Sequence, residues 1–439
     1  MNYQQTLNYL YQFIGSQRTR AATPQTAAQK LDRMHLLLEK IALATIPFPC
    51  IIVAGTNGKG STCAMLESIL RTAGYRTGLW TSPHLCSYRE RIQVNRQMIS
   101  RPSLVEAVQR IKSIIDTFDT SLYGTPTTFE LGFALALTYF AEQQVHCAIL
   151  EVGLGGRYDC ANVLTPLVSA ICSIGYDHMD ILGSTLTRIA YDKAGIMKPG
   201  IPTITVPQQE EAATVLAAVA AEVEAVLWMA DERGISPPGE ATGTRSPQPY
   251  PVAPDTSLYG LFQQENARLA LGLAMLLREK GFVLSSRVMA QGLATVQWSG
   301  RMEVVAEQPL VLLDGAHNPD SAEKLLCSLE TQFTFERLIL ILGTSRDKHF
   351  DRMAATLVPH ARILILTHSS HPRAETNLDM VADVVKPHLH GILFTIPDIA
   401  AALDKALSLA TLHDVICVTG SLFVVGAARA VLGLAPESD

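Results

Sequence analysis

Paired cysteines are missing from this sequence of 439 residues. None of its eight cysteines stands in a CxxC pair or at the spacing of a zinc site, which disfavours a disulfide-stapled scaffold and a zinc module. Most of them lie in apolar runs, where a free thiol behaves as a small hydrophobic group. A reducing, cytoplasmic location is therefore expected.

Charge is also sparse, and basic runs are absent. Charged residues make up 17% of the chain, and 35 basic against 41 acidic residues leave a net charge of −6. Binding to nucleic acid without sequence preference needs a positive footprint, which this chain lacks. No nucleic-acid partner is expected.

Long apolar runs are absent as well. The run at 131–141 is far shorter than the ~20 residues of a membrane span, and the first residues, MNYQQTLNYLYQFIG, lack the pattern of a signal peptide. No membrane partner is expected. Apolar residues nevertheless make up 48% of the chain, enough to fill a large interior.

Short apolar runs alternate with helical patterns, which predicts an α/β fold with a mostly parallel sheet. The first half offers a helix at 61–73, ended by Gly74, and strands at 50–54, 76–80, 148–152, 168–174 and 203–206. Residues 234–256 are dense in proline and glycine and are interpreted as an exposed loop or insertion.

A second series of strands and helices follows Trp298. Its expected strands are 310–313, 338–342, 362–366, 392–395 and 415–419. Together they predict one compact Rossmann-like domain. The expected organisation is a large P-loop ATPase domain with a parallel sheet at 1–300 and a smaller C-terminal Rossmann-like domain at 301–439.

The strongest local motif is GTNGKGST at 55–62, between an expected strand and an expected helix. Backbone N–H groups of such a loop bind phosphate oxygens, and Lys59 would neutralise their charge. The loop departs from GxxxxGK[ST] by an extra glycine after the lysine. The context of strand, loop and helix favours a P-loop over an ordinary turn.

Two acidic motifs follow expected strands. Glu151 opens EVGLGGRYD, which fails the dinucleotide pattern GxGxxG because Tyr158 takes the third glycine position. A carboxylate at the carboxyl end of a parallel strand is a candidate Mg²⁺ ligand. His178 stands beside Asp177 and Asp180 in DHMDILG. Lys193, in DKAGIMKPG, would by composition alone be a surface charge.

Ten motifs occur in order along the chain: GTNGKGS, TSPHL, TTFE, LEVGLGGR, DHMDILG, DKAGIMKPG, FQQEN, SGRME, DGAHNP and GSLF. Together they resemble the folylpolyglutamate synthase/dihydrofolate synthase family of the Mur-ligase superfamily. The resemblance implies an ATP-dependent ligase that adds L-glutamate to dihydropteroate and to the γ-carboxylate of reduced folates through an acyl phosphate. It also implies ATP bound between a P-loop domain and a smaller Rossmann-like domain.

The same resemblance implies roles for individual residues. Phosphate-binding positions are Asn57, Gly58, Lys59, Gly60 and Ser61. One or two Mg²⁺ ions would be held by Ser82, Glu151 and His178. Lys193 matches a lysine that is carbamylated in the superfamily.

Further positions match the nucleotide and pterin contacts of the family. Asn266, Arg301 and Asp314 match nucleotide contacts, and His317 is expected to face the triphosphate. The expected catalytic set is Lys59, His178, Lys193, Arg301 and His317. The pterin-cradling positions are Thr127, Thr128, Phe129, Glu130, Tyr158, Asp159 and Cys160.

Some positions depart from the family's pattern. Thr128 stands where an aromatic is frequent, Cys160 where alanine is common, and Phe262 where histidine is common. The first two leave open whether dihydropteroate is a substrate or only folate tails are extended.

Two remaining hypotheses are a different Mur-type amide ligase and a P-loop switch without ligase activity. A cell-wall ligase would need a UDP-binding domain before Gly55, where only 54 residues stand. A monomer is expected.

Overall fold

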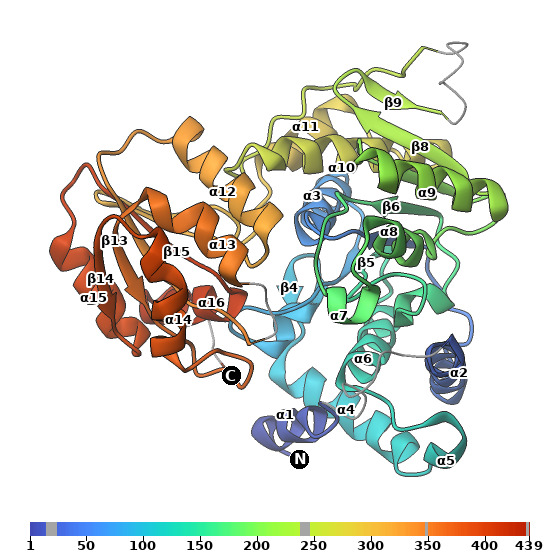
Figure 1. Cartoon of the computed structure of the whole chain (residues 1–439). Coiled ribbons are helices and arrows are strands. Elements are labelled where there is room, and N and C mark those ends of the chain that lie inside the picture. Colours follow the sequence, from blue (N-terminus) through green and yellow to red (C-terminus); the bar gives the residue numbers. More distant parts are fainter. Residues whose placement is uncertain (15–23, 238–245, 347–349, 436–438) are drawn as a thin grey trace. The chain divides into compact units, whose positions relative to one another are not determined.

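The computed structural model describes residues 1–14, 24–237, 246–346, 350–435 and 439. The chain forms two compact units (Figure 1). The first unit contains Met1–Pro83, Tyr88–Thr256 and Glu265–Val296, and the second contains His84–Ser87, Ser257–Gln264 and Gln297–Asp439. The division at 300/301 stays a prediction; the second unit begins its long segment at Gln297 and also includes two short earlier segments.

The first unit is built on a sheet whose described strands run in the order β4-β3-β2-β5-β1-β6-β7-β8-β9. The central strands from β2 to β8 are parallel, while β3, β4 and β9 are antiparallel at the two edges. The strands are β1 (Cys50–Ala54), β2 (Thr77–Trp80), β3 (Ile92–Val94), β4 (Gln97–Met98), β5 (Cys147–Glu151), β6 (Val168–Ile171), β7 (Pro202–Thr205), β8 (Val226–Asp231) and β9 (Gly234–Ser236).

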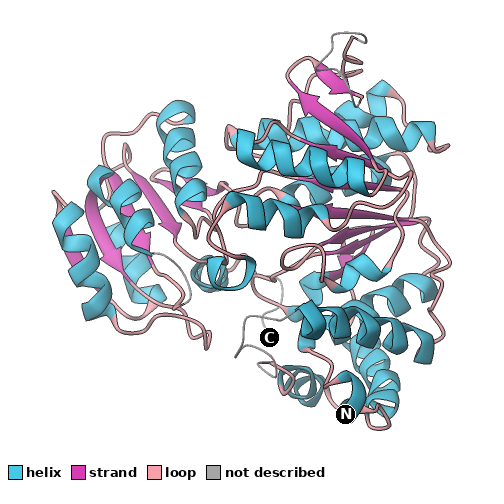
Figure 2. Ribbon diagram, turned by 45° about the vertical axis from the view of Figure 1, so that its right-hand side comes forward, coloured by secondary structure: helices cyan, strands magenta, loops and turns pink. Residues whose placement is uncertain are grey.

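Helices cover this sheet (Figure 2). Contact between α3 and α11 is so close that a Cβ on Gly292 would lie 2.6 Å from the Cα of Ile69. A large apolar cluster joins alternate residues of β1, such as Ile52, with α6. The helices are α1 (Tyr3–Tyr11), α2 (Pro24–Lys40), α3 (Lys59–Thr72), α4 (Arg101–Ile115), α5 (Thr120–Tyr123), α6 (Thr128–Glu142), α7 (Met179–Leu182), α8 (Leu186–Ala194), α9 (Glu210–Glu222), α10 (Phe262–Glu279) and α11 (Ser286–Ala294).

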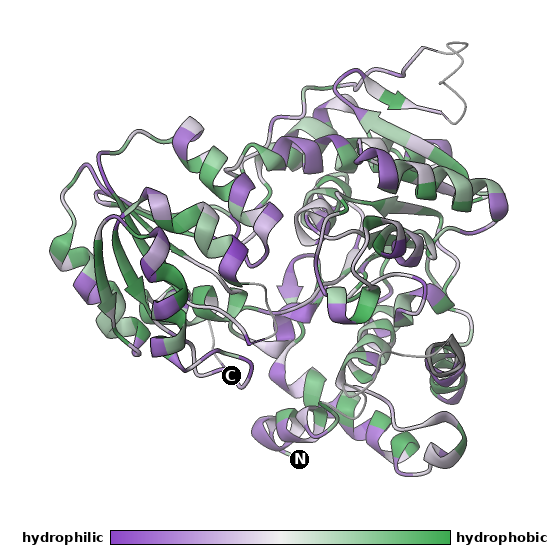
Figure 3. Cartoon of the chain, viewed as in Figure 1, coloured by the Kyte–Doolittle hydropathy of each residue, from purple (hydrophilic) through white to green (hydrophobic). Residues whose placement is uncertain are grey.

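The second unit has a six-stranded sheet in its described residues, in the order β10-β11-β15-β12-β13-β14. All pairs are parallel except β10 with β11. Its strands are strongly apolar (Figure 3) because both faces are covered by helices. The elements are β10 (Glu303–Glu307), β11 (Leu310–Leu313), α12 (Pro319–Gln332), β12 (Leu338–Leu342), α13 (Phe350–Leu357), β13 (Ala361–Leu366), α14 (Leu378–Val385), β14 (Ile392–Thr395), α15 (Ile399–Leu409), β15 (Val415–Thr419) and α16 (Leu422–Val431).

The predicted α/β architecture is confirmed, and several strands have the expected bounds. The interpretation of 234–256 as an exposed loop is wrong at its start. Gly234–Ser236 forms the buried strand β9, which pairs with β8, and Ile235 also bridges Gln248. Residues 238–245 of that stretch lie outside the described residues.

All eight cysteines are free thiols, as expected from their spacing. Six are buried, Cys86 is half-buried and Cys327 is exposed. Within the described ranges, no helix combines the length and the apolar character that crossing a membrane requires.

Candidate functional site

The predicted P-loop joins the buried strand β1 to α3. Gly55 and Gly58 have φ angles of +143° and +89°, which residues with a Cβ rarely adopt. The amides of Thr56 and Asn57 donate to the carbonyl of Ser173 at 2.9 and 3.3 Å, just past β6. These bonds hold the loop at the carboxyl edge of the parallel sheet, where ligands bind in such folds.

The loop leads directly into a helix N-terminus. Gly58 is the N-cap of α3 and has no side chain to cap the first-turn amides. Such amides, together with the helix dipole, favour a bound anion. Asn266 of α10 lies against the loop, since a Cβ on Gly58 would lie 2.2 Å from its Oδ1. The structure thus brings the predicted phosphate loop and the predicted nucleotide contact Asn266 together.

Two lysine amines converge on the backbone of this loop. The Nζ of Lys59 donates to the carbonyls of Gly55 at 3.2 Å and Thr56 at 3.0 Å. The Nζ of Lys193, at the end of α8, donates to the same Gly55 carbonyl at 2.7 Å. Residues 59 and 193 are far apart in the sequence, yet both amines share one carbonyl oxygen.

Lys193 is a buried amine rather than a surface charge. Its side chain is only 3% exposed. Burial, reinforced by the nearby charge of Lys59, lowers the pKa of Lys193 to about 7. The carboxylates of Asp192 and Asp177 act in the opposite direction. A large fraction of this amine is consequently neutral, and nucleophilic, near neutral pH.

A buried carboxylate lies at the end of the neighbouring strand. Glu151 is the last residue of β5, pairs in register with Val53 of β1 and is 4% exposed. Its Oε2 accepts from the amide of Ser82 at 2.8 Å. Two of the three predicted metal ligands are therefore in contact, beside the P-loop. Their oxygen atoms suit a hard cation such as Mg²⁺.

His178 has an unusual backbone conformation. Its φ is +50° at the N-cap of α7, and its amide donates to Oδ1 of Asp177 at 2.8 Å. The same Oδ1 lies 4.0 Å from its Nε2. No group of three or more His, Cys, Asp or Glu side chains forms a metal cluster among the described residues.

The segment predicted to cradle a pterin begins α6. Thr127 is its N-cap and accepts from the amide of Glu130, while the Glu130 carboxylate accepts from the amide of Thr127 at 2.7 Å. The hydroxyl of Thr128 donates to the carbonyl of Leu10 at 2.7 Å. Glu130 also forms a buried ion pair with Arg33 of α2, at 2.7 Å. These three predicted contacts therefore hold helices in place.

Phe129, the aromatic residue of that segment, has different contacts. The ring of Phe129 lies 5.3 Å from that of Trp80, and a Cβ on Gly153 would lie 2.3 Å from it. Asp159 holds the same loop, because its Oδ2 accepts from the amides of Gly153 at 3.0 Å and Leu154 at 3.4 Å. Burial raises the pKa of Asp159 to about 6. Phe129 and Asp159 thus both contact the loop at Gly153.

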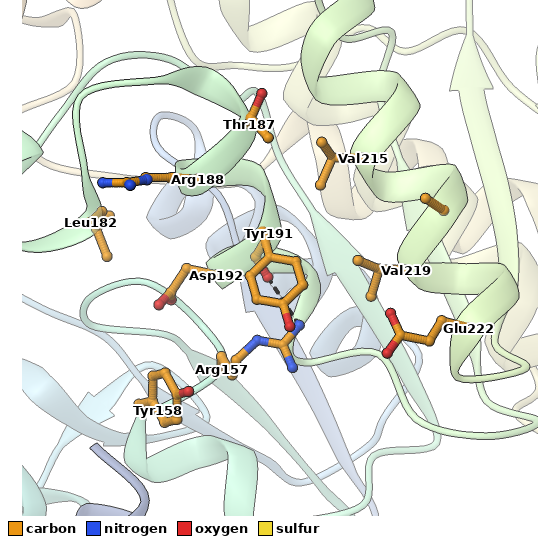
Figure 4. Close-up of a pocket in the computed structure, with 11 residues that line it drawn as sticks. Arg157, Tyr158, Leu182, Thr187, Arg188, Tyr191, Asp192, Val215, Val219 and Glu222 are labelled. Atoms are coloured by element: carbon orange, nitrogen blue, oxygen red, sulfur yellow. Dashed lines mark hydrogen bonds between the residues drawn. The ribbon is translucent and has the colours of Figure 1, made fainter. Parts of the chain in front are cut away.

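The last two residues predicted to contact the pterin, Tyr158 and Cys160, have different surroundings. The thiol of Cys160 is buried beside Asp159, at 3.8 Å from Oδ1. Tyr158 instead lines a surface pocket together with Arg157 and Tyr191 (Figure 4). The structure does not gather all the predicted pterin positions around one point.

Three predicted residues lie in the second unit, at the carboxyl end of β11. The carboxylate of Asp314 accepts from the amides of Met302 at 2.9 Å and Ala316 at 2.8 Å. Burial raises the pKa of Asp314, and the Arg301 guanidinium opposes that shift. His317 Nδ1 lies 2.8 Å from the carbonyl of Gly315. Arg301, Asp314 and His317 form one local cluster.

Arg33 and Trp80 also shape this region, although neither was predicted from the sequence. Arg33 lies on an ordinary amphipathic helix, and nothing local indicates that its partner is 97 positions away. Trp80 ends a predicted strand directly before the TSPHL motif, and that position is a signal that could have identified it.

The two halves of the chain match two known domain families. Residues 53–274 match the Mur ligase middle domain, and residues 300–422 match the Mur ligase glutamate ligase domain. The chain is 37% identical to the dihydrofolate synthase/folylpolyglutamate synthase of Bacillus subtilis, over 80% of this chain and 83% of that protein.

Solved structures show the same likeness. Folylpolyglutamate synthase of Mycobacterium tuberculosis, complexed with ADP and AMPPCP, is 28% identical with a TM-score of 0.85, over 99% of this chain and 100% of that one. The bifunctional folylpolyglutamate synthase/dihydrofolate synthase of Yersinia pestis, complexed with AMPPNP and a Mn ion, is 30% identical with a TM-score of 0.79, over 99% and 98%.

Proposed function

Because this chain belongs to the folylpolyglutamate synthase/dihydrofolate synthase family of the Mur ligases and is an ATP-dependent ligase, we propose that it has both activities of that family. One activity adds L-glutamate to the carboxylate of dihydropteroate. The other adds L-glutamate to the γ-carboxylate of a reduced folate. The convergence of Lys59, Lys193 and Asn266 on the loop 55–58 is the observation that supports the ATP-dependent step common to both activities.

The substrate carboxylate is a poor electrophile, so it must be activated before an amine can attack it. An oxygen of the substrate carboxylate attacks the γ-phosphorus of ATP, ADP departs, and an acyl phosphate forms. The neutral amine of glutamate then attacks the acyl carbon, inorganic phosphate departs with the C–O bonding pair, and the amine releases a proton. The protein mainly positions these groups and stabilises their charge.

The residues of the first unit supply those stabilising groups. The amides at the start of α3 and the Lys59 ammonium would hold the β- and γ-phosphates. Ser82, Glu151 and His178 would hold one or two Mg²⁺ ions, which supply charge neutralisation at the phosphate oxygens. Arg301, Asp314 and His317 remain proposed contacts of the second unit. Asn266 remains the proposed nucleotide contact on α10.

We propose that Lys193 carries a carbamate. Its neutral amine would attack the carbon of CO₂ and release a proton, which gives an N-carboxylate. That group is an oxygen donor and would extend the ligand set of a hard cation. Burial of the amine against the Gly55 carbonyl and its pKa of about 7 support this proposal.

Dihydropteroate ligation rests on the Phe129 and Asp159 pair. An aromatic ring beside the loop 153–154 can stack on a flat pterin. Asp159 is buried and already accepts backbone hydrogen bonds, which supports a role in shaping that loop. Extension of folate tails alone is the second candidate, favoured by Thr128, whose hydroxyl is bound to Leu10 where the family often has an aromatic.

The decisive experiment measures glutamate-dependent ADP release with ATP, Mg²⁺ and either dihydropteroate or tetrahydrofolate, and identifies each product by mass. Both substrates are expected to gain one glutamate residue. Turnover with tetrahydrofolate and none with dihydropteroate, across a wide concentration range, would reduce the proposal to tail extension. ATP hydrolysis independent of glutamate and folate would contradict both activities.

A further inference from the structure

A surface pocket of about 470 Å³ lies within the first unit, between the loop after β5 and the helices α8 and α9 (Figure 4). Its volume is within the ~300–1,000 Å³ typical of small-molecule sites. We call it the Arg157 pocket and define it by Arg157, Tyr158, Arg188, Tyr191, Ala218 and Val219. None of these residues has a role in the reaction described above except Tyr158, a predicted pterin contact.

One wall of the Arg157 pocket is aromatic and apolar. Tyr158 and Tyr191 contribute rings, and Val215, Ala218 and Val219 contribute the facing side of α9. Tyr191 is 47% exposed, an unusually open position for an aromatic ring. Such a wall favours a flat ring that can lie between tyrosines and a methyl-covered helix.

The pocket also contains the guanidinium of Arg157. The Arg157 guanidinium lies 4.0 Å from the centre of the Tyr191 ring, and its Nη2 donates to the Tyr191 carbonyl at 3.2 Å. Its Nε is buried and has no hydrogen-bond partner within the described part of the chain. A ligand carboxylate would pair with the charge of this guanidinium.

Two arginines and two acids line the pocket. Arg188, which also lines the pocket, is exposed and adds a second positive charge. Of the two acids, Asp192 interacts with the backbone amides of Gly156 and Arg157 and with the charges of Lys193 and Arg157. Glu222 is exposed. Asp192 therefore offsets part of the Arg157 charge, and its own charge is shared with Lys193.

We propose that the Arg157 pocket is an accessory binding site for an aromatic carboxylate, with the ring against Tyr191 and α9 and the carboxylate on Arg157. The inference deepens the proposed function, on which it rests, because dihydropteroate carries a free carboxylate on its aminobenzoyl ring. The site differs from the Phe129 position, since Asp159 and Cys160 are buried while the neighbouring Tyr158 lines the pocket.

The test is binding of 4-aminobenzoate to the full-length protein without ATP, measured by calorimetry and ligand-observed NMR. Aniline lacks the carboxylate and cyclohexanecarboxylate lacks the aromatic ring, so both are expected to bind at least tenfold more weakly. Arg157→Met and Ala218→Trp are each expected to raise the Kd of 4-aminobenzoate about tenfold or more, the effect of losing one charge-assisted hydrogen bond or the space for the ring.

Matched variants keep the test decisive. Ala217→Trp places the same bulk on the neighbouring exposed position of α9, which does not line the pocket, and is expected to leave Kd unchanged. Arg188→Met provides a second charge variant at an exposed position, should Arg157→Met fail to fold. Loss of binding in Phe129→Ala but not in Ala218→Trp would overturn the proposal, and so would absence of binding at millimolar concentrations.

This binding assay is separate from turnover. If ligation fails while 4-aminobenzoate binds at Arg157, the accessory site stands and the proposed function falls. If ligation proceeds normally while the Arg157 and Ala218 variants bind 4-aminobenzoate like the wild type, only the accessory site is refuted.

Discussion

Carbamylation of Lys193 depends on the fraction of its amine that is neutral. With a pKa of about 7, roughly three quarters of the amine is neutral at pH 7.5, compared with about 0.1% for a lysine of pKa ~10.4. Reaction with CO₂ at a given concentration is thus favoured several-hundredfold relative to an ordinary lysine. The carboxylates of Asp177 and Asp192 moderate this shift, and the Lys59 charge strengthens it.

The sign of the pH dependence follows directly. Because the neutral amine is the reactive form, carbamylation at a fixed concentration of dissolved CO₂ should rise as pH increases through about 7. The neutral fraction grows from about 0.1 at pH 6 to about 0.9 at pH 8. Activity of enzyme equilibrated at each pH and then assayed at one common pH should follow the same curve.

The assay is ¹³C NMR of the full-length protein in ¹³C-labelled bicarbonate, with Lys193→Ala as the control. A carbamate signal is expected in the wild type and not in the variant. Removal of CO₂ should abolish ligase activity, bicarbonate should restore it, and short carboxylates should partly rescue Lys193→Ala. Wild-type activity in that variant, or no carbamate signal at pH 8 with saturating bicarbonate, would refute the reasoning.

Three further outcomes are expected. Lys59→Ala should lower ATP-dependent turnover at least a hundredfold while the protein stays folded, as measured by steady-state kinetics and circular dichroism. Glu151→Ala and His178→Ala should each raise the Mg²⁺ concentration needed for half-maximal rate, and the double variant should lose less than the product of the two single losses. Arg33→Met leaves a buried carboxylate on α6 unpaired and should lower the free energy of unfolding by about 3 kcal/mol in urea, whereas exposed Lys386→Met should change it by less than about 1 kcal/mol.

The central strands and the P-loop could be predicted because their signals are local. The apolar runs of β1 and β12 are bounded by turn residues, and Gly55 and Gly58 stand where the loop needs positive φ. Strands at or next to the edges of the first sheet were missed for the opposite reason. β4 has two residues, and the half-buried pattern of β8 carries no clear alternation.

The sequence could indicate which residues belong to the site, but not where their side chains lie. The order of motifs indicated Lys193, but its burial against Gly55 depends on packing between segments 138 positions apart. The sequence also grouped Tyr158 with Asp159, although one side chain lines a surface pocket and the other is buried. Neighbouring residues outside regular structure can point in different directions, and spacing alone does not reveal which.

Because most thiols are buried, their rate of alkylation should measure how often each unit opens. Alkylating reagents attack the thiolate, and burial raises the pKa of Cys50 and Cys147 in the first unit to about 12 and that of Cys417 in the second well above its usual value. Exposed Cys327 should therefore be labelled in the native state. The buried thiols should be modified only when their sheet opens, so peptide mass spectrometry after timed alkylation would report the opening of each unit separately.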